Sequence, residues 1–239
     1  MVIGKDGRIA ISGGAMGTAV LAANGDVLFT VADFGKVAFD AQGNLIIAGS
    51  SDILVGDSQP FLAMFDANGM LVARTVFEGN AQLTGLAVDA KGAVYLVGFT
   101  TGSVNLFGTV IKANFANEPG RISGAFLVKL ANGCASALEV RDLNIVEANG
   151  IAIDANGQIF IAGAVTGNTG FGRYIDLARI DVRGVMTNVD LGLGGFETVN
   201  GRVDAVAIDA CGSVFAALVH QDTPSVLSQI HALVIKVSL

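Results

Sequence analysis

The chain has 239 residues, of which 52% are hydrophobic and only 15% charged, and its formal net charge is −7. This composition excludes an intrinsically disordered chain, and the acidic balance without any run of Lys or Arg argues against nucleic acid and anionic membranes as partners. Charge-free stretches such as residues 9–25 are interrupted by glycine and do not supply the roughly 20 apolar residues of a membrane helix. We therefore expect no insertion into a membrane.

Targeting and cysteine motifs are also missing from the sequence. Met1 opens directly into a strand-like pattern, without the basic region, apolar segment and cleavage site of a secretory signal. The two cysteines, Cys134 and Cys211, show no CxxC or Cys/His spacing, which argues against zinc fingers and disulfide-rich scaffolds. No cofactor is expected.

A short phrase recurs five times along the chain: alternating apolar residues, Asp, two variable residues, Gly, and an apolar run that closes with Gly in most copies. The copies lie at residues 1–13, 37–49, 86–98, 151–163 and 206–218, and the second of them reads VAFDAQGNLIIAG. The first copy has Gly4 in place of the Asp, and the others carry Asp40, Asp89, Asp154 and Asp209.

The spacing of Asp and Gly within the phrase predicts a tight turn. An Asp side chain can accept hydrogen bonds from the backbone of its own turn, and a Gly three residues later supplies the positive φ that the turn needs. A ring of the four carboxylates around calcium is the alternative, because this ion requires several oxygen ligands at once. We adopt the turn interpretation.

Each copy is followed by further short apolar-rich segments separated by Gly-bearing turns, and no segment has a sustained helical period. The sequence therefore predicts five units of four antiparallel strands, the last ending before its fourth strand. These units cover residues 1–35, 36–84, 85–149, 150–204 and 205–239. Repeated units of this kind predict an all-β fold: a single β-propeller domain of about five blades with an incomplete last blade.

Residues 86–130 carry a family resemblance. They read LAVDAKGAVYLVGFTTGSVNLFG, then a variable loop, then GAFLVKL, which continues as ANG up to residue 133. This pattern resembles the bacterial SBBP-type β-propeller repeats of secreted and surface proteins, although the Trp usual in their fourth strand is absent. The resemblance implies an extracellular or cell-envelope location and a scaffold or binding role, and it brings no catalytic residues.

Loop lengths point to one face of the predicted disc as the binding surface. Antiparallel blades place the loops between second and third strands, and those between blades, on the face opposite the tight turns, and scaffolds carry specificity in such loops. The variable loops are predicted at residues 50–59, 77–84, 99–124, 141–149, 164–173, 192–204 and 219–230. Their polar candidates for binding are Asp57, Asn114, Asn117, Glu118, Arg121, Arg173, Glu197, His220 and Asp222.

A metal site is a further hypothesis for the last unit. His220 and Asp222 are two residues apart, and His231 begins the next predicted strand. Imidazole and carboxylate groups together can hold a transition metal or form an acid/base pair, whereas ordinary loop residues are the alternative interpretation.

The sequence favours a non-enzymatic propeller that presents variable loops to a glycan or protein partner. No GxSxG, HExxH or GxxxxGK motif occurs. A glycoside hydrolase or lyase is one alternative, and it requires Asp57, Glu118, Glu197 and Asp222 to converge over the channel. An assembly subunit or a fragment of a longer repeat protein is the other, since the open edge of the last blade invites self-association.

Overall fold

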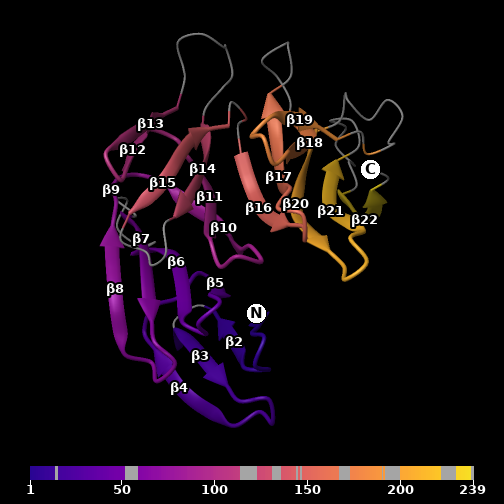
Figure 1. Ribbon diagram of the computed structural model, residues 1–239. Coiled ribbons are helices and arrows are strands. Elements are labelled where there is room, and N and C mark those ends of the chain that lie inside the picture. Colours follow the sequence, from indigo (N-terminus) through magenta and orange to yellow (C-terminus); the bar gives the residue numbers. More distant parts are fainter. Residues whose placement is uncertain are drawn as a thin grey trace.

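The chain folds into an arc of small antiparallel β-sheets (Figure 1). The computed structural model describes residues 1–13, 16–51, 59–113, 123–130, 136–143, 145, 147–166, 173–189, 191, 200–221 and 230–237. All regular elements within these ranges are strands. The all-β prediction is therefore confirmed.

Five of the sheets are blades that follow one another in chain order. Blade 1 consists of β1 (Val2–Ile3), β2 (Ile9–Ser12), β3 (Thr18–Leu21) and β4 (Val27–Val31). Blade 2 consists of β5 (Lys36–Phe39), β6 (Leu45–Ser51), β7 (Gln59–Phe65) and β8 (Leu71–Val76). Blade 3 consists of β10 (Gln82–Val88), β11 (Val94–Thr100), β14 (Gly124–Leu130) and β15 (Ala137–Asp142). Blade 4 consists of β16 (Glu147–Ile153), β17 (Ile159–Thr166), β18 (Arg173–Ile180) and β19 (Met186–Asn188). Blade 5 contains three strands in the described part, β20 (Asn200–Ile208), β21 (Val214–Gln221) and β22 (Ile230–Val237).

The first strand of each blade lies on the inner side of the arc. β5 contacts β10, β10 contacts β16, and β16 contacts β20, whereas the later strands of each blade lie progressively farther out (Figure 1). The predicted repeat of antiparallel blades matches this arrangement. Blades 1 and 5 form the two ends of the arc and stand apart.

The recurring aspartates hold the tight turns between the first two strands, as predicted. In blade 3, Asp89 Oδ1 accepts hydrogen bonds from the backbone N–H of Lys91 at 2.8 Å and of Ala93 at 2.9 Å. Gly92 has φ +85° and donates its N–H to the Asp89 carbonyl at 3.0 Å. Asp40, Asp154 and Asp209 make the same pair of backbone contacts. In blade 1, Asp6 takes over this task by accepting from the Arg8 N–H at 3.1 Å.

In blades 2 to 4 the second strand extends two or three residues beyond the Gly that closes the phrase. β11 continues past Gly98 to Thr100, and β6 and β17 likewise continue past Gly49 and Gly163. These three glycines are needed for a close approach. A Cβ built at Gly98 would overlap the Gln82 carbonyl oxygen of the neighbouring strand and stand 2.8 Å from the Phe126 ring. The loops predicted to start at residues 50, 99, 164 and 219 consequently begin in strands.

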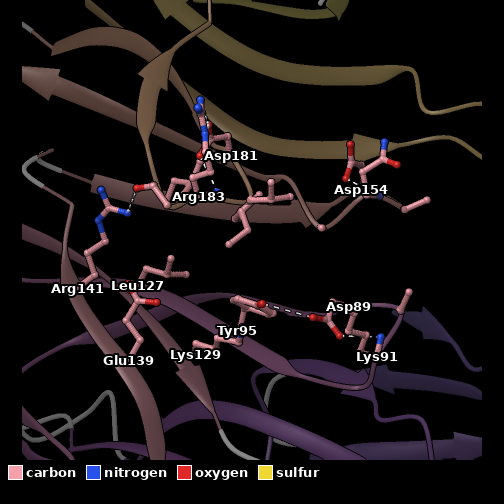
Figure 2. Close-up of a pocket in the computed structure, with 18 residues that line it drawn as sticks. Asp89, Lys91, Tyr95, Leu127, Lys129, Glu139, Arg141, Asp154, Asp181 and Arg183 are labelled. Atoms are coloured by element: carbon pink, nitrogen blue, oxygen red, sulfur yellow. Dashed lines mark hydrogen bonds and ion pairs between the residues drawn. The ribbon is translucent and has the colours of Figure 1, made fainter.

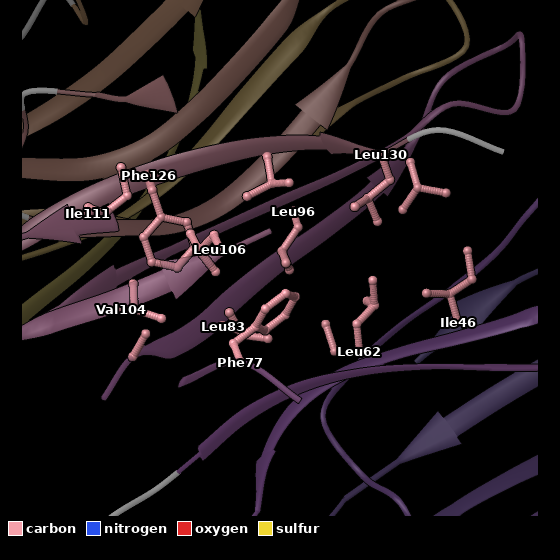
Figure 3. Packing of buried hydrophobic residues seen from close by; sticks show 14 of the residues in the cluster. Ile46, Leu62, Phe77, Leu83, Leu96, Val104, Leu106, Ile111, Phe126 and Leu130 are labelled. Atoms are coloured by element: carbon pink, nitrogen blue, oxygen red, sulfur yellow. The ribbon is translucent and has the colours of Figure 1, made fainter. Parts of the chain in front are cut away.

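A sixth sheet occupies the long predicted loop at residues 99–124. β12 (Ser103–Leu106) and β13 (Thr109–Lys112) form a hairpin, and β12 also pairs with β9 (Glu78–Gly79). Val104, Leu106 and Ile111 of this hairpin are buried together with Phe77 and Phe126 against blades 2 and 3 (Figure 3). Much of the loop is therefore part of the core rather than a free binding loop.

The core consists of four apolar layers, one between each pair of consecutive blades. Side chains alternate along each strand, so that a blade contributes one face to the layer before it and the other face to the layer after it. In blade 3, for example, Leu96 packs towards blade 2, whereas Val97 packs towards blade 4. This double burial explains the near-continuous apolar second strands.

Candidate functional site

The residues predicted for the loop face lie largely beyond what the structure describes. Asp57, Asn114, Asn117, Glu118, Arg121, Glu197 and Asp222 are outside the described residues. Arg173 is the first residue of β18, and His220 and His231 are register partners in β21 and β22. The structure describes the backbone of these three residues, and their side chains lie outside the described part. The loop-face and metal-site hypotheses therefore stay predictions.

A cleft opens on the opposite face, where the tight turns of blades 3 and 4 meet (Figure 2). Its volume is about 450 Å³, within the usual range of roughly 300–1,000 Å³ for small-molecule sites. Blade 3 contributes the turn at Asp89 and the outer strands β14 and β15. Blade 4 contributes its two turns, residues 154–157 and 181–184.

Tyr95 and Lys129 form the middle of the blade 3 wall. The Lys129 ammonium lies 5.2 Å from the centre of the Tyr95 ring, and the Tyr95 hydroxyl donates a hydrogen bond of 3.3 Å to Asp89 Oδ2. Interaction with Tyr95, together with the charges of Asp89 and Glu139, raises the pKa of Lys129 against the opposing effect of burial. Lys129 is therefore firmly cationic at neutral pH.

Arg141 joins the two walls. Its Nη1 donates a hydrogen bond of 2.8 Å to the carbonyl oxygen of Gly184, in the turn after β18. Glu139 lies two residues earlier on β15 and therefore on the same side of the strand. Besides Asp89 and Lys91 of its turn, blade 3 thus brings to the cleft the guanidinium of Arg141, the ammonium of Lys129 and the carboxylate of Glu139.

The other carboxylates of the cleft are already occupied by their own turns. Asp154 Oδ1 accepts from the N–H groups of Asn156 and Gln158 at 2.9 and 2.8 Å. Asp181 Oδ1 accepts from two backbone N–H groups, and its Oδ2 lies 2.9 Å from Nη2 of Arg183. The backbone N–H of Val185 and then the Arg183 side chain hold the pKa of Asp181 below its usual value. These carboxylates already accept hydrogen bonds within their own turns. The groups of the cleft that can bind a ligand are therefore mainly hydrogen-bond donors.

A perturbed carboxyl group lies away from the cleft, in the layer between blades 3 and 4. Asp176 in β18 is only 4% exposed, its Oδ2 has no hydrogen-bond partner, and burial raises its pKa to about 6. It pairs in register with Gly163, as Phe61 and Phe126 pair with Gly49 and Gly98 in blades 2 and 3. An acid therefore stands where two other blades bury a phenylalanine.

Sequence reasoning missed both the cleft and Asp176. The cleft combines two turns and two strands of different units, and its position becomes visible only when the blades are placed side by side. Asp176 did leave a signal, because aligning IDLARIDVRG with FLAMFDANG puts it opposite Phe61.

Two further observations limit the chemistry of the described residues. No group of three His, Cys, Asp or Glu residues within them is arranged to hold a metal ion. The four turn aspartates each bind their own backbone, which contradicts a shared calcium ring.

No helix in the described part of the chain is long and apolar enough to cross a bilayer.

Comparison with solved structures establishes the fold class. The Dos1 propeller matches with a TM-score of 0.52 and 12% identity, over 98% of this chain and 66% of that chain. The fold is that of a β-propeller. A protein of unknown function from Dyadobacter fermentans DSM 18053 matches this propeller with a TM-score of 0.51 and 12% identity, over 83% of this chain and 64% of its own. The tricorn protease matches with a TM-score of 0.50 and 12% identity, over 96% of this chain and 26% of its own.

The propeller spans between 26% and 66% of the length of these three structures. Identities of 12% indicate a shared fold, and function has to be argued from the site itself. No protein-family model and no curated protein matches the chain.

Proposed function

We propose that this propeller is a non-enzymatic binding module that holds an acidic saccharide in the cleft between blades 3 and 4. The observation that carries the proposal is the balance of donors and acceptors in the cleft. Asp89, Asp154 and Asp181 already accept hydrogen bonds from their own turns, whereas Lys129 and Arg141 bring charged N–H donors. A ligand that matches this surface is rich in oxygen acceptors and negatively charged.

A uronic-acid sugar has these properties. Its carboxylate suits Lys129 and Arg141, since hydrogen bonds between ionised partners are roughly twice as strong as neutral ones. Its hydroxyl groups can donate to Glu139, which makes none of the turn contacts of the three aspartates. The resemblance to SBBP-type repeats supports a location outside the cytoplasm, in the cell envelope or the medium, and we propose that location too.

The enzyme alternative makes a different demand on the cleft. A glycoside hydrolase uses two carboxyl groups, about 5–9.5 Å apart, of which one must exchange protons with the substrate. In this cleft Glu139 is the carboxylate left over once the turn aspartates are assigned to their backbone contacts. This favours binding over hydrolysis at the site.

Titration calorimetry with a trisaccharide of galacturonic acid tests the proposal. We expect binding that weakens with added salt, and a roughly tenfold loss of affinity in Lys129→Ala, which corresponds to ~1.4 kcal/mol. Lys36→Ala is the matched control, because Lys36 is an exposed lysine of blade 2 outside the cleft. Equal affinity for the neutral galactose trisaccharide, or an unchanged affinity in Lys129→Ala, would contradict the proposal.

The same mixtures distinguish binding from catalysis. We expect the trisaccharide to be recovered intact after prolonged incubation, as judged by mass spectrometry. Release of smaller products would support the glycoside hydrolase or lyase alternative instead.

A further inference from the structure

The face of blade 1 that points away from blade 2 is apolar and open. Ile11 is 46% exposed on this face, whereas the residues at the same repeat position in the next three blades, Ile47, Leu96 and Ile161, are fully buried. Ile3 on the same face is 63% exposed. In blades 2 to 4 this face packs against the blade before it.

The face of blade 5 that points away from blade 4 has the same property. Val234 in β22 is 68% exposed, whereas Leu62, Leu127 and Leu177 at its repeat position are between 0% and 3% exposed. Ala205 and Ala207 of β20 are also exposed on this face. In blades 2 to 4 the equivalent face packs against the blade that follows.

The two open faces are therefore the two halves of one kind of interface. Each of the four layers in the core joins a face of the blade 5 type to a face of the blade 1 type. Within one molecule the two faces do not meet in the described part of the chain, because blades 1 and 5 lie at opposite ends of the arc (Figure 1).

We propose that blade 5 of one molecule packs against blade 1 of a second copy of this chain. The contact repeats the internal layers: the branched side chains Ile3 and Ile11 meet Val234, and the alanines of β20 allow a close approach. Such a contact is head-to-tail, so it leaves one face of each kind open and permits further copies to add. This inference is independent of the proposed saccharide site.

Sedimentation equilibrium of the purified chain tests the association. We expect masses above the 24.3 kDa of the monomer that increase with protein concentration, and a return to the monomer mass in both Ile11→Lys and Val234→Lys. Leu138→Lys is the matched control, because Leu138 is 65% exposed on the outer strand of blade 3. A wild-type chain that stays monomeric at all concentrations would overturn the proposal.

Mixing the two blocked variants distinguishes this contact from a symmetric one. Ile11→Lys retains an intact blade 5 face and Val234→Lys retains an intact blade 1 face, so the mixture should form a dimer with one copy of each. Association of either variant alone, or a mixture that remains monomeric, would contradict a head-to-tail contact. Far-UV circular dichroism of each variant confirms that it is folded.

Discussion

The free energy of unfolding should fall by about 3 kcal/mol when Gly98 is replaced by alanine, the upper end of the usual cost of over-packing. The added methyl group would overlap the backbone carbonyl of Gln82 and press on the Phe126 ring, and neither can move without disturbing β10 or the core. β10 already carries a bulge between Leu83 and Gly85, next to this contact. Urea denaturation measures the effect.

Gly102→Ala is the matched control for this substitution. A Cβ at Gly102 would meet no atom within 4 Å, so its replacement should leave the free energy of unfolding within about 0.5 kcal/mol of the wild type. Equal stabilities of the two variants would show that the close approach at Gly98 does not determine the residue there.

The second large effect is expected at Asp176, where the loss of a charge should stabilise the protein. Burial raises the pKa of this carboxyl to about 6 from the ordinary 3.8. The folded state therefore keeps a proton that the unfolded state releases between about pH 4 and pH 6, so the wild-type chain becomes less stable as the pH rises through this interval. Asp176→Asn removes this dependence and should raise the free energy of unfolding at pH 7 by up to about 3 kcal/mol.

Urea denaturation from pH 4 to pH 7 checks this prediction. The stability difference between Asp176→Asn and the wild type should grow with pH, and a constant difference would contradict the account. Asp66→Asn provides a contrast of opposite sign. The backbone N–H of Met70 holds the pKa of Asp66 below its usual value, so this carboxylate stabilises the fold above about pH 4 and ceases to do so in acid.

The repeated phrase shows which features of the fold could be predicted from the sequence and which could not. The phrase of Asp and Gly three residues apart predicted the tight turns of blades 2 to 5, because a turn of this kind depends on residues within its own few positions. Gly98 belongs to the same phrase, but residues near it in the sequence do not explain why a glycine is needed there. The Gln82 carbonyl, 16 residues earlier in the sequence, leaves no room for a side chain at position 98.

The candidate site was harder to predict than the fold. The cleft depends on how Lys129 and Arg141 of blade 3 stand against the turn at Gly184 of blade 4, which is a matter of packing between units. The exposure of the outer faces of blades 1 and 5 could not be predicted from the sequence for the same reason. Ile11 and Ile47 occupy the same position in the repeat, and only the placement of the blades exposes one and buries the other.

Amide hydrogen exchange with and without the galacturonic acid trisaccharide tests the central claim, that the cleft between blades 3 and 4 is the binding site. We predict slower exchange on addition of the trisaccharide in the turns that border the cleft, at residues 89–92, 154–157 and 181–184. The equivalent turn of blade 2, at residues 40–43, should exchange at an unchanged rate. Slower exchange confined to the opposite face, for example at residues 100–103, would contradict the claim and return the site to the loops.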